Sequence, residues 1–597
     1  MSSWTAGDRT WSSACLHKDS IRQLLNSMNL KDFSRLRTRI PIVGLLQSYQ
    51  RQFLRADLIS GVTVWGVIVP AAMAYAELAG LPPQAGLYAA FASMIAYAIF
   101  ATSRHLKVTA SSTMAIMSAA LVADLGAGGS LERYAALSAM LAMVVGGMIL
   151  LAGIARLGFI SDFLSKPVIT GFLFGVSVSI IIGQAPKLFG LRGGTGDIFQ
   201  QLSQLITGLG NTNPLTLAIG AGSLLLIFIL KRYARRIPAG LVALLVGIVV
   251  TTVFKLDQRG VSVVGSIPLS LPAPTVPLVN LSDVALLIAG AGGIVFLAIG
   301  ESVGTARAFA AKHHYEIEPN QELIALGAAN LTAGLFQGFT VDASLSATAT
   351  GDDAGAQTQL SSIISVALIL VTIVVLADLF TNLPNAVLGA VVIYSVSGLV
   401  KLGPLKRFYR VYRTDFWLSV IALVGVIATG VLSGLLVAVF LSIIIVVYRS
   451  SRPYLAVLGK VPSLPGNYGN LERHPEYERI PGLLILRPDA PLFFANANLA
   501  RTQVLSLVAS SEPPAKAVLL DIGASNTLDI TSLDMLKGLV DDLNDANVEI
   551  ILAQARGPVR DELRVSGLLD QIGENNIYLS VESGVQDFLK HHPSEKD

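Results

Sequence analysis

The sequence contains little charge and almost no cysteine. Only 14% of its 597 residues are charged, against about 25% in an average soluble domain, so a fully water-exposed surface is excluded. The single cysteine, Cys15, lies in a polar N-terminal stretch, which excludes a disulfide framework and a thiolate metal site. The formal net charge of +3 is too small and too dispersed to predict nucleic-acid binding.

Long apolar runs fill most of the chain instead. Hydrophobic residues make up 53% of the sequence, and many runs reach the roughly 20 residues that a helix needs to cross a bilayer. The pattern predicts an α-helical membrane protein. We expect fourteen spans, at about 58–78, 84–101, 111–125, 133–155, 165–185, 214–230, 238–255, 286–311, 321–337, 343–354, 359–379, 384–400, 415–430 and 432–449.

Basic residues indicate the orientation of these spans. Residues 1–57 contain many Lys and Arg residues and no apolar core of a signal peptide, so we expect a cytoplasmic N-terminal region. Alternate loops are basic, as the positive-inside rule requires for cytoplasmic loops; Asp352 and Asp353 mark the one exception. The basic loop residues are Arg104, Lys107, Arg156, Lys166, Lys231, Arg232, Arg235, Arg236, Arg307, Lys312, Lys401, Lys406, Arg407, Arg410 and Arg413.

The fourteen spans divide into two halves of seven around a predicted outer loop at 256–285. An odd number of spans inverts the second half relative to the first. Secondary transporters with such inverted repeats bind their substrates near the bilayer midplane, where broken helices from the two halves meet. The sequence therefore predicts a transporter built as a 7+7 inverted repeat.

Two similar hydroxyl-rich stretches occupy the third span of each half, "VTASSTMA" at 108–115 and "VDASLSAT" at 341–348. Both are too short and polar for a continuous crossing helix. If each is extended at first and becomes helical near Ser111 or Ser344, two helix N-termini point toward each other across the midplane. Such termini bind anions through free amides and the helix dipole. The alternative is that small residues here only permit close helix packing.

Other polar residues within the spans are further candidates. Glu301 suits a proton carrier or a sodium ligand, although a structural pair with Arg307 is the alternative. Glu77, near an outer span end, is predicted to be structural or gating, and His313 and His314 to be solvated loop residues without metal-ligand spacing. Pro70 interrupts the first span, and Tyr75 and Met73 follow it. The predicted substrate-binding residues are Ser111, Ser112, Thr113, Ser344, Leu345, Ser346, Ala347, Tyr75 and Met73.

Several motifs resemble the SulP family of sulfate permeases and related anion transporters. They are "PAAMAYAELAGLPPQAGLYAAF" at 70–91, "TSRHLKV" at 102–108, the stretch 301–336, "ASLSATA" at 343–349 and "LPNAVLGAVVI" at 383–393. The resemblance implies a core domain that moves against a gate domain, a homodimer, an anion site between the third and tenth spans, and a coupling role for Glu301.

The sequence departs from the family pattern near the proposed site. Lys107 and then Thr109-Ala110 stand where the family commonly has Ser and then Gly-Pro. Ala347 stands where many members have an Arg that helps to hold the anion. Binding by helix dipoles and hydroxyls alone favours a monovalent anion such as bicarbonate more than the family resemblance suggests.

The region after the last span is polar. Residues 450–480 are Pro-rich and predict a linker, and residues 481–597 alternate strand-like and helical runs, an α/β pattern. This region resembles the cytoplasmic STAS domain of SulP proteins. In related domains a Ser or Thr after an Asp is phosphorylated, which makes Thr531 and Ser532 candidates, although helix capping explains both equally well.

The sequence thus predicts a multi-pass cell-membrane protein, with transporter domain 58–449, that moves a small inorganic anion, most readily sulfate, coupled to H⁺ or Na⁺. Bicarbonate transport is one alternative, and an uncoupled anion channel or an anion-sensing protein is another. No catalytic constellation predicts an enzyme, and no cofactor is expected beyond the coupling ion.

Overall fold

A computed structural model describes residues 41–126, 130–159, 165–191, 198–234, 238–265, 272–398, 400 and 402–592. The chain forms two compact units, Met1–Ser442 and Ile443–Asp597.

Each of the fourteen expected spans contains a helix, and the predicted fold class is confirmed. The helices differ from the predicted ranges mainly at their ends; the first begins at Phe53, five residues early. They are α4 (Phe53–Leu78), α5 (Pro83–Phe100), α6 (Ser112–Gly126), α7 (Leu131–Ile154), α8 (Lys166–Phe189), α10 (Pro214–Tyr233), α11 (Ala239–Phe254), α12 (Leu281–Lys312), α13 (Pro319–Leu335), α14 (Leu345–Asp353), α15 (Leu360–Val371), α16 (Asn385–Ser397), α18 (Arg413–Thr429) and α19 (Val431–Ser450).

Among the described residues of the first unit, three further α-helices lie outside the predicted spans. They are α3 (Pro41–Ser48), α9 (Ile198–Gly208) and α17 (Leu402–Val411). Helices α9 and α17 are too short to cross a bilayer, and each carries polar residues along one face. By length and composition, seven of the described helices can cross a membrane; α6 and α14 are not among them, as expected of broken helices.

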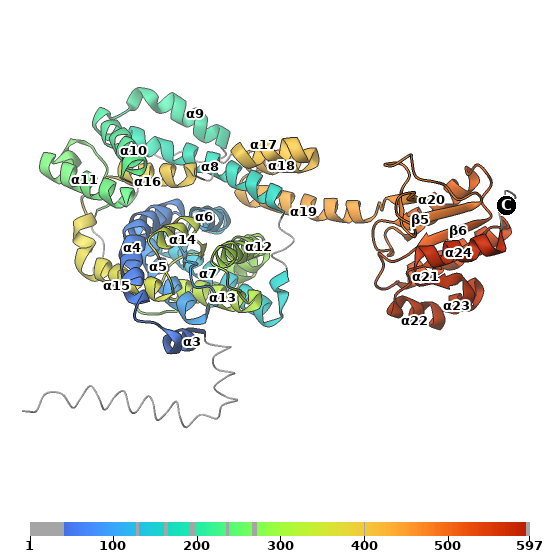
Figure 1. The fold of residues 1–597 in the computed structure, drawn as a ribbon. Helices are drawn as coiled ribbons and strands as arrows, with labels where there is room; N and C mark the ends of the chain where they lie inside the picture. Colours follow the sequence, from blue (N-terminus) through green and yellow to red (C-terminus); the bar gives the residue numbers. More distant parts are fainter. Residues whose placement is uncertain are drawn as a thin grey trace, which may run out of the picture. The chain divides into compact units, whose positions relative to one another are not determined.

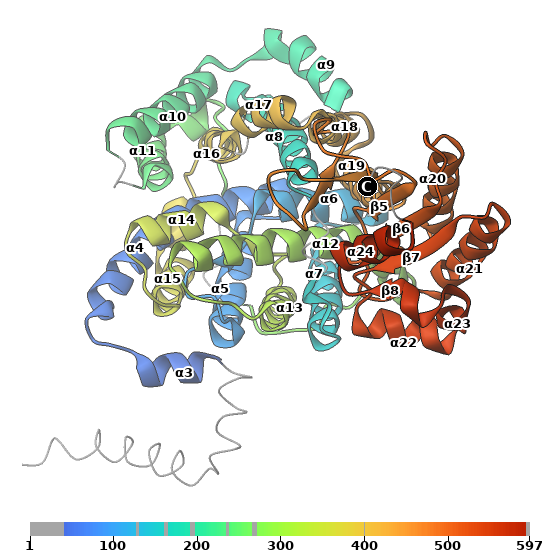
Figure 2. The same cartoon turned by 45° about the vertical axis from the view of Figure 1, so that its right-hand side comes forward.

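The helices of the first unit form two groups. Figures 1 and 2 show α4, α5, α7 and α12–α15 packed together, and α8–α11 with α16–α18 beside them as a second group. Within the first group, Gly146 of α7 and Gly327 of α13 face each other so closely that a Cβ on either would meet the partner's backbone within 3.0 Å. Small residues thus bring the helix backbones into contact, as is common in membranes.

The second unit contains a six-stranded sheet of order β4-β3-β5-β6-β7-β8. Strands β5 to β8 are parallel, and β3 and β4 extend the sheet antiparallel. Alternate residues of β6 pack in different apolar cores. Val518 and Leu520 pack with residues of α20 and α21, whereas Leu519 packs with residues of α24. The elements are β3 (Leu455–Lys460), β4 (Tyr468–Asn470), β5 (Leu483–Pro488), α20 (Ala497–Ala509), β6 (Ala517–Asp521), α21 (Ile530–Asp545), β7 (Glu549–Ala553), α22 (Gly557–Val565), α23 (Leu568–Ile572), β8 (Ile577–Tyr578) and α24 (Val581–His591).

Two details of this unit differ from the sequence interpretation. The interval expected as a linker, 450–480, contains β3 and β4, because its polar and Pro-rich loops surround one short apolar run, "LAVLG" at 455–459. At the start of α21, Asp529 is the capping residue; its side chain accepts a hydrogen bond from the Ser532 amide at 2.8 Å. Ser532 is fully buried, whereas Thr531 is exposed.

Candidate functional site

The two hydroxyl-rich stretches meet in the first unit. Each begins as a two-residue strand, β1 (Val108–Thr109) and β2 (Asp342–Ala343), and the strands pair antiparallel with Val108 opposite Ala343. The Ser344 amide extends the pairing by donating to the Lys107 carbonyl at 2.9 Å. Segments more than 200 residues apart in sequence therefore lie side by side, as the inverted repeat predicts.

A helix follows each strand, and a serine caps each helix. The Ser111 hydroxyl accepts from the Met114 amide at 3.2 Å, and the Ser344 hydroxyl accepts from the Ala347 amide at 3.3 Å. Each serine also accepts the first intrahelical bond through its carbonyl. The first two amides of each helix, at 112–113 and 345–346, have no partner within the helix by position. They are the groups that can donate to an anion.

The strand pairing fixes how these helix starts face each other. Because β1 and β2 are antiparallel, α6 and α14 leave the pair in opposite directions and their N-termini point inward. Ser111 lies four strand positions from the position opposite Ser344, or about 13 Å at 3.3 Å per residue. Two positive helix-dipole ends therefore flank one short polar segment.

The predicted residues around the helix starts differ in exposure. Ser112, Thr113 and Ala347 are buried. By contrast, Leu345 is 45% exposed and Ser346 is also exposed, so the first turn of α14 is accessible.

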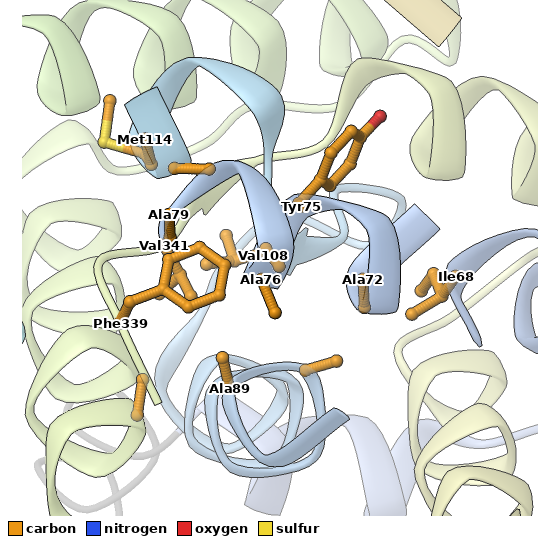
Figure 3. Close-up of a cluster of buried hydrophobic side chains, with 14 of the residues drawn as sticks. Ile68, Ala72, Tyr75, Ala76, Ala79, Ala89, Val108, Met114, Phe339 and Val341 are labelled. Atoms are coloured by element: carbon orange, nitrogen blue, oxygen red, sulfur yellow. The ribbon is translucent and has the colours of Figure 1, made fainter. Parts of the chain in front are cut away.

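Two residues of α4 were predicted to line the site. Tyr75 is 6% exposed, and Figure 3 shows its hydroxyl directed away from the cluster formed by Ala76, Val108 and Phe339. Met73 is completely enclosed in the apolar core. Met73 therefore contributes packing and not a lining surface, because residues two apart on a helix point in different directions.

Lys107 differs from its predicted position in an exposed cytoplasmic loop. It is completely buried, and its ammonium donates to the hydroxyls of Ser361 at 2.6 Å and Ser362 at 2.8 Å. Its backbone amide also donates to Thr348 of α14. The positive-inside pattern could not show this, because a buried and an exposed lysine contribute equally to a loop charge count.

Buried carboxylates of the first unit fall into two kinds. Asp57 accepts from the amides of residues 357 and 358, and Glu322 accepts from the amides of residues 102 and 103, so both have the donors of structural groups. Asp342 is also completely buried, yet neither of its oxygens has a hydrogen-bond partner among the described residues. The half-buried Glu301 carboxyl and the Ser111 side chain lie beside it.

His313 is exposed, as predicted, but it also belongs to a cluster of contacts that the sequence did not indicate. Its ring stacks on that of His105, with centroids 4.1 Å apart, and its Nε2 lies 2.6 Å from Asp352. Burial, together with the neighbouring His313, lowers the pKa of His105 to about 4. His314 is exposed, as predicted. Sequence spacing missed this cluster because its members come from three distant segments.

A cavity of about 1430 Å³ lies elsewhere in the first unit. Its walls include α3, the end of α7 and the segments around Arg104 and Asn320. None of the predicted substrate-binding residues lines it. It is therefore separate from the paired helix starts.

The helical core with two inwardly directed half-helices, together with a separate α/β unit, defines the inverted-repeat class of membrane transporters. A probable sulfate transporter of Mycobacterium tuberculosis is 37% identical over 92% of this chain and 98% of its own length. The structure of the murine solute carrier 26 member A9 anion transporter matches with a TM-score of 0.84 at 23% identity, over 99% of this chain and all of that one.

A cyanobacterial bicarbonate transporter domain matches with a TM-score of 0.58 at 22% identity, over 66% of this chain and 98% of that one. The family model described as "Sulfate permease family" matches residues 54–422, and the one described as "STAS domain" matches residues 474–584. The chain belongs to the sulfate permease family and carries a C-terminal STAS domain.

Proposed function

We propose that this protein is a secondary active transporter that takes up sulfate together with protons. The observation that carries this proposal is the antiparallel pairing of β1 and β2, which directs two serine-capped helix N-termini at one segment. The naming of relatives as sulfate transporters supports the choice of anion. We place the STAS domain in the cytoplasm and expect a homodimer in the cell membrane, as the family resemblance implies.

The two helix ends provide useful binding energy without a full cation. A helix end carries about half an elementary charge, so at about 5 Å and an effective dielectric of 20 each contributes roughly 1.7 kcal/mol per anion charge. Two ends give about 3 kcal/mol for a monovalent anion and about twice that for sulfate. Unpaired amides at 112–113 and 345–346 add directed hydrogen bonds.

Asp342 makes proton coupling the consistent choice. An ionised carboxylate in β2, between the two helix starts, repels an incoming anion. Two adjacent carboxyls can hydrogen-bond to each other only when one carries a proton, and Glu301 lies beside Asp342. Anion binding and protonation of this pair therefore support each other. Sodium remains the competing coupling ion, because carboxylate and hydroxyl oxygens also suit a hard cation.

Bicarbonate is a second candidate substrate. The observation that favours it is local charge: position 347 holds a buried alanine, and the buried Lys107 ammonium is directed at Ser361 and Ser362. A site without a directly contacting cation has a weaker preference for a divalent anion over a monovalent one.

Uptake of labelled sulfate and bicarbonate into proteoliposomes under imposed gradients tests the substrate. We expect sulfate accumulation that requires an inward proton gradient and persists without sodium. Flux that ignores every gradient would identify a channel, and binding without net flux an anion sensor. Either outcome, or accumulation of bicarbonate alone, contradicts the proposal.

Paired serine variants test the binding site. Ser344→Ala removes a cap hydrogen bond of 3.3 Å, and Ser130→Ala removes a cap hydrogen bond of the same length from α7, away from the site. We expect S344A to weaken sulfate binding by roughly 10- to 150-fold, the value of one hydrogen bond to a charged group, and S130A to leave it unchanged. Equal behaviour of the two variants would refute the assigned site.

Carboxyl variants test the coupling. Asp342→Asn and Glu301→Gln should retain sulfate exchange between equal concentrations but lose accumulation driven by a proton gradient. Asp283→Asn, at the first turn of α12, is the control and should behave like the wild type. Wild-type pH dependence in both D342N and E301Q would exclude the pair from coupling.

A further inference from the structure

A histidine and carboxylate cluster lies outside the proposed anion site. His105 belongs to the segment between α5 and β1, His313 follows the last residue of α12, and Asp352 lies in the last turn of α14. Each offers one potential ligand atom, and the three atoms lie within 4.8 Å of one another. Three separate elements therefore converge on one point of the first unit.

His105 has the hydrogen bonding of a metal ligand. It is 4% exposed, and its Nδ1 lies 3.2 Å from the Tyr315 hydroxyl. Its Nε2 is buried and has no hydrogen-bond partner among the described residues. Metal-ligating histidines typically have one ring nitrogen fixed by such a partner while the other binds the ion. An unpartnered buried nitrogen is otherwise costly.

The two other ligands can reach an ion only after small movements. The rings of His313 and His105 are almost parallel, at 10°, so their lone pairs do not converge until one ring rotates. The His313 side chain is 33% exposed and has room to rotate. In a tetrahedral zinc site neighbouring ligand atoms are about 3.3 Å apart. Here all three lie within 4.8 Å of one another and His313 Nε2 lies 2.6 Å from Asp352, so the longest separation has to shorten and the His313–Asp352 contact has to lengthen.

The Lys312 ammonium competes with a metal ion for Asp352. Its ammonium forms an ion pair with Asp352, whose side chain is only 4% exposed. The Lys312 side chain is 59% exposed and can move into solvent. A divalent ion therefore takes over the charge compensation of Asp352.

We propose that His105, His313 and Asp352 bind one divalent transition-metal ion of the zinc class. Two imidazoles and one carboxylate are the ligands that Zn²⁺ accepts, whereas Mg²⁺ and Ca²⁺ prefer oxygen-only sites. Three protein ligands leave a fourth position for water. The ion joins the C-terminal end of α14, the helix whose first turn carries Ser344, to the end of α12. This site is independent of the identity of the transported anion.

The test uses the full chain without a polyhistidine tag, treated with a chelator and then titrated with Zn²⁺. We expect His313→Ala to weaken binding at this site at least about tenfold, since even outer-shell changes cost 10- to 100-fold. His314→Ala is the matched control, because the adjacent His314 is exposed and outside the cluster. It should bind like the wild type. The remaining histidines are common to both variants and cancel in the comparison.

Two further variants separate a metal site from a purely structural cluster. Lys312→Met removes the competing ammonium and should tighten Zn²⁺ binding by up to about fivefold, since an exposed ion pair contributes up to about 1 kcal/mol. Tyr315→Phe should weaken it by roughly 10- to 100-fold through the loss of the outer hydrogen bond. Weaker binding in K312M contradicts the proposal.

Co²⁺ provides an independent readout of geometry. Tetrahedral Co²⁺ absorbs strongly in the visible range, and we expect this band in the wild type and H314A and its absence in H313A. Because the His313 side chain is partly exposed, H313A should fold, which gel filtration checks. If the wild type takes up no more Zn²⁺ than H313A, or if H314A loses as much as H313A, the site does not exist.

Discussion

The ion pair between Glu77 and Lys187 joins the two helix groups. Glu77 lies in the last turn of α4 in the first group, and Lys187 lies in the last turn of α8 in the second. The side chains are only 14% and 24% exposed. An interaction across the boundary stabilises the arrangement seen here relative to any arrangement in which the groups move apart. Glu77→Gln removes it while keeping the side-chain shape.

The free energy that the Glu77–Lys187 ion pair contributes lies between two known limits. Exposed ion pairs contribute up to about 1 kcal/mol, whereas breaking a buried pair costs about 3 to 5 kcal/mol. At least three-quarters of each side chain is buried here, so we expect about 2 to 3 kcal/mol, a factor of roughly 30 to 150 in the equilibrium between arrangements. The double exchange E77K/K187E should restore much of it.

Distances between spin labels measure this equilibrium. Replacing Cys15 gives a cysteine-free chain, to which cysteines are added at Leu131 of α7 and Leu215 of α10, both exposed residues of different groups. We expect the E77Q variant to shift the distance distribution away from that of the parent. Arg133–Asp283, an ion pair between α7 and α12 within one group, gives the control. If E77Q and D283N leave the distribution equally unchanged, the pair does not hold the groups together.

Three further predictions concern packing, charge and pH. Gly86→Ala places a Cβ 1.8 Å from a backbone carbonyl oxygen of α4 and should abolish folding, whereas G147A, where nothing lies within 4 Å, should be neutral; gel filtration separates these outcomes. Lys107→Met removes the buried ammonium that donates to Ser361 and Ser362. It should weaken anion binding roughly tenfold without lowering Tm, by the loss of about 1 to 2 kcal/mol of longer-range attraction; an unchanged Kd refutes this. Burial raises the pKa of Asp529, but hydrogen bonds from neighbouring groups lower it by more, so the pKa is lowered overall. A lowered pKa stabilises the folded state at pH values above the unfolded pKa of about 3.9, and this stabilisation is lost as the pH falls below that value. Hydrogen exchange at the start of α21 should therefore rise below about pH 4 in the wild type. The D529A variant should lose this pH dependence.

The fourteen helices could be predicted from the sequence because length and hydropathy are local properties. A bilayer requires an apolar run of about 20 residues for each continuous crossing, and seven of the described helices are long and apolar enough to meet this requirement. The two broken helices were also predictable, since their hydroxyl clusters interrupt the apolar pattern at matching places. Helix ends were less certain, as the early start of α4 at Phe53 shows, because an end depends on local capping.

The partners of individual side chains could not be predicted. The sequence placed Lys107 in a charged loop and made Met73 a candidate substrate-binding residue, but packing encloses both side chains. The polarity of 450–480 indicated a linker, whereas the short run at 455–459 finds a partner strand in β5. These errors share one cause: burial and strand pairing depend on residues far away in the chain.

The sequence by itself determined the class of this protein: an inverted-repeat membrane transporter with two hydroxyl-rich helix starts and an α/β domain. That information lies in the composition and in the pattern of hydropathy along the chain, because each membrane crossing depends on the hydropathy of consecutive residues. Only the tertiary structure decided that Ser344 pairs with Lys107, that Asp342 is buried without a donor among the described residues, and that His105 meets His313. These contacts join segments more than 200 residues apart, and only folding brings such segments together.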